Sequence, residues 1–127
     1  MSSFYDCFVS CDHEAAKRLV TNALDSQRFS VEPQPDGNWL AKRGSMGATV
    51  LLGSLAGKKN FHVTLGVHFF QDEQGRFVIR LDKKAGMGFV KGGAIGLARM
   101  DTAFIETAQA LHAALSQAGV LLRTAES

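Results

Sequence analysis

The strongest constraint on the fold is the strict alternation in residues 61–70, FHVTLGVHFF. A period of two is typical of a β-strand with one buried face. The polar segment QDEQG follows, and residues 76–84, RFVIRLDKK, alternate in the same way, so the sequence predicts an antiparallel hairpin. The apolar face of this hairpin would carry Phe61, Val63, Leu65, Val67, Phe69, Phe77, Ile79 and Leu81.

The opposite face of the same hairpin is polar and partly basic. We expect Phe70 to lie opposite Arg76, because this pairing makes the two apolar rows coincide. The polar face then brings histidines and arginines together. With Lys91 from the following loop, it forms a candidate anion or partner face: His62, His68, Phe70, Arg76, Arg80 and Lys91.

Two helices flank the predicted strands. Asp12 or Ser10 can cap a helix over residues 12–27, and the apolar stripe of residues 96–118 predicts a long second helix that ends near Gly119. Residues 119–127 are expected to fray. Further strands are expected at 3–10, 28–33, 38–44 and 48–55.

The predicted order is therefore β-α-β-β-β-β-β-α in one domain, residues 1–127. We predict an α+β fold, in which an antiparallel sheet of five to six strands carries an N-terminal helix and a long C-terminal helix across one face. The segment KGGAIG, residues 91–96, joins the last predicted strand to the long helix.

This order, with its glycine-containing join, resembles the START/Bet v1-like superfamily, also called the helix-grip or polyketide cyclase-like fold. The resemblance implies a ligand cavity between the long helix and a concave sheet. The chain departs from the pattern in being short and in having one N-terminal helix rather than two, and both differences would shrink the cavity. The residues that would line it are Trp39, Leu65, Val67, Ile79, Phe104, Leu111 and Leu115. An ordinary packed core is the alternative role for the same side chains.

Nucleotide-binding and catalytic motifs do not fit. The glycines of residues 85–100 miss the G-x-G-x-x-G spacing, and no strand is expected after the helix, so we interpret them as a packing or hinge segment with an anion site as the alternative. LLGSLAGKK lacks the spacing of a P-loop, and no nucleophile elbow or metal-ligand spacing is present. We therefore expect no metal and no cofactor, and enzymatic activity is unsupported.

Charge and cysteine content set the remaining expectations. Residues 37–99 carry ten basic and three acidic side chains, between two acidic ends of a chain with net charge +2. Cys7 and Cys11 are interpreted as free thiols of a reducing compartment. With no signal peptide and no apolar run of membrane length, we expect a cytoplasmic protein.

The sequence favours a noncatalytic domain that binds a small apolar ligand or a protein partner. One alternative is an anion or nucleic-acid binder that uses the basic region 37–99. Another is a small hydrolase or cyclase with a site between helix and sheet. A homodimer is a further expectation, because the mixed apolar and basic face could pair with a second copy.

Overall fold

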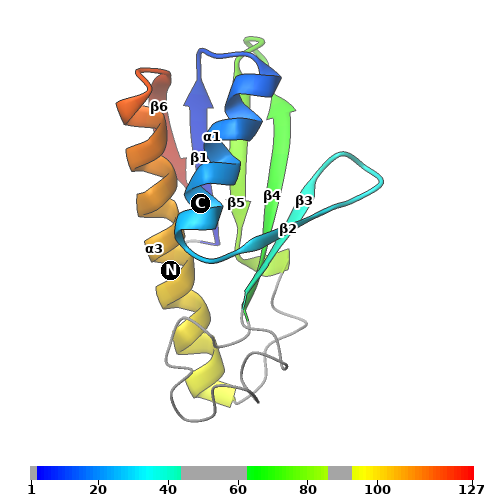
Figure 1. Cartoon of the computed structure of the whole chain (residues 1–127), viewed down its shortest axis with the longest axis vertical. Coiled ribbons are helices and arrows are strands. Elements are labelled where there is room, and N and C mark those ends of the chain that lie inside the picture. Colours follow the sequence, from blue (N-terminus) through cyan, green and yellow to red (C-terminus); the bar gives the residue numbers. More distant parts are fainter. Residues whose placement is uncertain (1–2, 44–62, 86–92) are drawn as a thin grey trace.

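The computed structural model describes residues 3–43, 63–85 and 93–127. In the described part of the chain, the helices lie on one side of a single sheet (Figure 1). The helices are α1 (His13–Ser26) and α3 (Gly93–Gln117). The strands are β1 (Phe4–Val9), β2 (Ser30–Pro33), β3 (Trp39–Arg43), β4 (Val63–Gln71), β5 (Phe77–Asp82) and β6 (Leu121–Glu126).

The sheet has six strands in the order β2-β3-β4-β5-β1-β6, and every neighbouring pair is antiparallel. Both helices pack on the same face of this sheet and against one another (Figure 1). The predicted α+β class, with an antiparallel sheet of five to six strands, is confirmed, although β6 among the six described strands was not predicted. No helix within the described ranges is long and apolar enough to cross a membrane.

The β4–β5 hairpin keeps the predicted faces in a different register. Phe70 lies opposite Val78, and Gln71 opposite Phe77, so the expected pairing of Phe70 with Arg76 is wrong by two residues. The Asp72 carboxylate accepts hydrogen bonds from the backbone N–H groups of Gln74 and Arg76, which draws Arg76 into the turn. A shift of two residues leaves each side chain on its predicted face, because the side-chain period of a strand is two.

Helix α1 is fixed at both ends by local hydrogen bonds. The Asp12 side chain accepts a hydrogen bond from the Ala15 N–H at 2.8 Å, as an N-cap residue does. At the other end Arg28 adopts a left-handed conformation, with φ of 66°, and the Phe29 N–H donates to the Leu24 carbonyl. This Schellman-type turn places the Phe29 ring in the core, where it is 3% exposed.

The end of the chain forms a sixth strand, and the expectation that residues 119–127 fray is wrong. Gly119, with φ of 74°, ends α3 as predicted, and the Val120 N–H donates to the Leu115 carbonyl. This cap reverses the chain so that β6 runs antiparallel to β1, with Asp6 opposite Ala125. The long helix is therefore followed by a strand, and β1 lies inside the sheet rather than at its edge.

The core lies between the two helices and the sheet. It holds the apolar rows of the β4–β5 hairpin together with the inward faces of β1, α1 and α3. The strand expected at 48–55, and the segments containing His62 and Lys91, lie outside the described residues.

Candidate functional site

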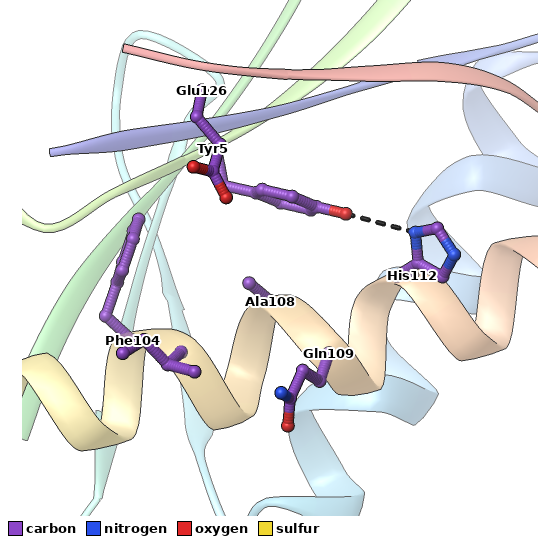
Figure 2. A pocket seen from close by; sticks show the side chains of 7 residues that line it. Tyr5, Phe104, Ala108, Gln109, His112 and Glu126 are labelled. Atoms are coloured by element: carbon purple, nitrogen blue, oxygen red, sulfur yellow. Dashed lines mark hydrogen bonds between the residues drawn. The ribbon is translucent and has the colours of Figure 1, made fainter. Parts of the chain in front are cut away.

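A cleft of about 350 Å³ opens between α3 and the edge of the sheet formed by β1 and β6. Figure 2 shows Tyr5 and Glu126 on the sheet side, and Phe104, Ala108, Gln109 and His112 along the helix that faces them. Among the described residues, those that line it are Tyr5, Phe104, Ile105, Ala108, Gln109, His112 and Glu126.

The helical repeat explains how α3 supplies most of this lining. Phe104 and Ala108 belong to the stripe that faces the core and are nearly buried. Ile105, Gln109 and His112 form the adjacent stripe, since residues spaced by three or four share a helix face. That stripe borders the cleft, and Ile105 is 51% exposed there. The cleft therefore lies between the flank of α3 and the strands β1 and β6.

Two polar groups meet at one end of the cleft. The Tyr5 hydroxyl and His112 Nδ1 are 3.1 Å apart and share a hydrogen bond (Figure 2). Burial is the largest cause that raises the pKa of Tyr5 to about 12, and the nearby Cys7 and Glu126 raise it further. The phenol is consequently neutral at physiological pH, where it can both donate and accept a hydrogen bond.

The raised pKa of Tyr5 predicts a loss of stability at high pH. The folded protein holds the phenol proton more tightly than the unfolded chain, so this stabilisation is complete below pH 10 and disappears as the pH rises towards about 12. We expect the free energy of unfolding, measured by urea titration, to fall more steeply over this window in the wild type than in Tyr5→Phe. Parallel curves for the two proteins would contradict the assignment.

Most of the residues predicted to line a ligand cavity lie in the packed core instead. Five of them are at most 2% exposed and belong to the buried cluster: Leu65, Val67, Ile79, Leu111 and Leu115. Phe104 does line the cleft, and Trp39 lines a separate shallow hollow beside α1.

Sequence reasoning missed most of the lining of the cleft. Ile105, Gln109 and His112 carried a usable signal, because their spacing of four and three places them beside the predicted apolar stripe. Glu126 carried none, since its strand was not predicted. The sequence predicted that Tyr5 lies in a strand, but it did not predict which helix packs against this residue.

The predicted anion or partner face lies on the side of the sheet that faces away from the helices. Its described cations have acidic partners. The Arg80 guanidinium donates two hydrogen bonds to the Asp6 carboxylate, at 2.8 and 3.0 Å. His68 Nε2 lies 2.9 Å from Asp82 Oδ2, and Arg76 pairs with Asp72 at 2.8 Å. Asp6 is nearly buried. Because it lies 74 residues before Arg80 in the chain, the sequence alone does not indicate this ion pair.

Aromatic rings on this face are covered by the same cations. The Arg80 guanidinium lies 5.0 Å from the centre of the Phe70 ring and 4.9 Å from that of Phe4. The Arg76 guanidinium lies 5.2 Å from the centre of the Phe8 ring. His68, Phe70 and Arg80 therefore lie together on this face, as predicted. Their basic groups contact carboxylates and aromatic rings of the same face rather than an external anion.

Neither cysteine is an activated nucleophile. Cys7 is fully buried in β1, and burial raises the pKa of its thiol to about 12. Burial also raises the pKa of the Cys11 thiol. Among the described residues, no three His, Cys, Asp or Glu side chains are grouped closely enough to hold a metal ion.

No protein-family model matches the chain, and no curated protein shows significant similarity to it.

Proposed function

We propose that this chain is a noncatalytic binding domain, and that its ligand is a small molecule whose apolar body fills the cleft between α3 and the β1–β6 edge. The observation that carries the proposal is an open, mainly apolar cleft of about 350 Å³ with a few polar groups at its margins. Small-molecule sites generally have this composition, and their volumes run from about 300 to 1,000 Å³.

The position of the cleft agrees with the resemblance to the helix-grip fold. The described elements from β1 to the long helix are compatible with the expected order, the strand expected at 48–55 lying outside the described residues, and the cleft involves that helix and the sheet. It differs in location, because the middle of the sheet is filled by packed side chains and the cleft lies at the edge. The added strand β6 forms one wall.

The lining residues favour binding over catalysis. None of the seven described lining residues is a serine, threonine, cysteine or lysine, and the side chains that could take part in chemistry are Tyr5, His112 and Glu126. His112 is its one imidazole, and its Nδ1 atom is occupied by the Tyr5 hydroxyl. The anion-binding alternative is less favoured, because three basic side chains of the predicted anion face, His68, Arg76 and Arg80, lie against the carboxylates of Asp82, Asp72 and Asp6.

Filling the cleft should weaken ligand binding. Ala108 is 9% exposed and lies in the cleft between the Phe104 and His112 turns of α3, so the ring of Ala108→Phe would occupy the ligand volume. We expect the affinity for a simple aromatic probe, benzyl alcohol, to fall at least about tenfold, which corresponds to 1.4 kcal/mol. Chemical-shift titration of the isotope-labelled protein would measure the loss.

Ala113→Phe is the matched control, because it adds the same ring to an exposed position of α3 outside the cleft lining. It should leave the affinity unchanged. Equal binding by the wild type and Ala108→Phe would show that the ligand does not enter this cleft.

A further inference from the structure

We propose that the shallow hollow beside α1 is a second binding site, and that its ligand is an aromatic anion: a planar ring that carries a phosphate or carboxylate group. The volume of this α1 hollow is about 320 Å³. Its described lining residues are Glu14, Lys17, Arg18, Thr21, Asn22 and Trp39. None of them lines the α3 cleft, so the inference goes beyond the proposed function and does not depend on it.

One polar face of α1 supplies most of the hollow. Its members are spaced by three or four residues, as in Glu14, Lys17 and Thr21, so they lie on the same side of the helix. The buried residues of α1 belong to a different face, which packs on the core. Trp39, the first residue of β3, completes the described lining. The hollow therefore joins charged helix surface to an aromatic ring of the sheet.

The two cations of the hollow are available to a ligand. Lys17 and Arg18 form no ion pair with a carboxylate of the described residues, whereas Arg76 and Arg80 on the outer face of the sheet do. With Glu14 as the one acid, two cations and one carboxylate give the described lining a net charge of +1. An anion is attracted to such a lining, and an arginine guanidinium can bind a phosphate or carboxylate through two parallel hydrogen bonds.

Phe69 brings the aromatic ring of the hollow close to one of these cations. The centres of the Trp39 and Phe69 rings are 4.8 Å apart in an edge-to-face contact, and Lys17 Nζ lies 5.5 Å from the centre of the Phe69 ring. The Asn38 side chain accepts a hydrogen bond from the Phe69 N–H at 3.1 Å, which holds the start of β3 beside β4. The indole and the ammonium group are therefore neighbours of the same ring.

A ligand with both a ring and an acidic group uses the whole lining. Trp39 is partly exposed, so a planar ring can pack against its indole. An acidic group on that ring can then reach the cations of α1, and the amide of Asn22 offers further N–H donors. A neutral ring would gain only the contact with Trp39, and an inorganic anion would gain only the attraction of the cations. The combination favours an aromatic anion over either part alone.

Fluorescence titration tests the proposal directly, because Trp39 is the one tryptophan of the chain and lines this hollow. Four probes separate the contributions of ring and charge: phenyl phosphate and benzoate combine both, benzyl alcohol is a neutral ring, and inorganic phosphate is an anion without a ring. The proteins are the wild type, Arg18→Gln, Glu14→Gln and Arg123→Gln. Arg123 is an exposed arginine of β6, at the opposite edge of the sheet from β2 and β3, so it provides the matched control.

We expect at least one of the two aromatic anions to bind at least about tenfold more tightly than benzyl alcohol and inorganic phosphate. Arg18→Gln should weaken the binding of that anion at least about threefold, and Glu14→Gln should strengthen it, because the first removes an attraction and the second a repulsion. Arg123→Gln should leave it unchanged. The three substituted side chains are exposed, so the variants should fold, as circular dichroism would verify.

Three results would overturn the inference: equal affinity for the charged and neutral rings, unchanged affinity in Arg18→Gln, or no change in Trp39 fluorescence with any probe at millimolar concentration. Each of them would leave the proposed function of the α3 cleft untouched, because that function is measured through other residues. If the expected pattern is found, the tighter binder of phenyl phosphate and benzoate identifies the acidic group that the hollow prefers.

Discussion

Leu65→Ala is expected to lower the free energy of unfolding by about 2–5 kcal/mol. Leu65 is completely buried in β4, opposite Ala41 of β3, and it belongs to the core between the sheet and the helices. Removing three carbon atoms from such a site forfeits their transfer from water and leaves a void that a close-packed interior fills only in part.

Urea denaturation followed by circular dichroism would measure this loss, with Leu122→Ala as the matched control. Leu122 is 53% exposed in β6, so the same truncation there should change the free energy of unfolding by no more than about 0.5 kcal/mol. The comparison also bears on the predicted ligand-lining role of Leu65. A cost below about 1 kcal/mol would mean that Leu65 faces a loosely packed cavity rather than a solid core.

The parts of the fold that could be predicted are those determined by local periodicity. The alternation in residues 61–70 and 76–84 identified the strands β4 and β5 and assigned their faces correctly. The register was less accessible, because it depends on the Asp72 carboxylate, which binds the backbone of the turn and draws Arg76 into it. Periodicity is unchanged by a shift of two residues, so it could not detect this difference.

The strand β6 could not be recognised from its own sequence. LLRTAE has little alternation and follows a helix-ending glycine, and both features are typical of a fraying tail. Its order comes from pairing with β1, which is more than 100 residues earlier in the chain, as in the pair Asp6 and Ala125. Such long-range pairing is determined by the whole fold. The cleft could not be predicted in full for the same reason, because one of its lining residues, Glu126, belongs to this strand.

The outer face of the sheet illustrates a related limit. His68 and Arg80 were grouped correctly, but a concentration of basic residues in the sequence suggested an open anion site. Asp6 is 74 residues from Arg80 in the chain, yet it lies directly opposite Arg80 in the β1–β5 pair. The net charge of a region sums residues that are neighbours in the sequence. The carboxylate that neutralises a given arginine can come from a distant part of the chain, because strand pairing decides which residues become neighbours in space.

The pairing of β6 with β1 leads to a prediction that distinguishes neighbouring residues. Phe4 and Ser127 exchange both of their backbone hydrogen bonds, at 3.0 and 3.1 Å. Opposite residues in an antiparallel pair alternate between bonded and non-bonded positions. The Ala125 N–H therefore points towards Asp6 of β1, and the Thr124 N–H points away from β1.

Proline at these two positions should have very different effects. Ala125→Pro removes a donor to β1 and leaves the Asp6 carbonyl without its ladder partner, which we expect to cost about 2–3 kcal/mol of stability. Thr124→Pro removes an N–H that faces the open edge, where proline is tolerated, and should cost less than about 1 kcal/mol. Thermal and urea unfolding of the two variants would measure the difference.

The comparison depends on the register of β6 and not only on its presence. If residues 119–127 were a frayed tail, both substitutions would be nearly neutral. If β6 were shifted by one residue relative to β1, Thr124→Pro would be the more destabilising of the two. Because Glu126 is two residues beyond Thr124 on the same face of β6, a larger cost for Ala125→Pro would also support the position of the carboxylate in the cleft. Stability measurements on the strand would then bear directly on the wall of the proposed binding site.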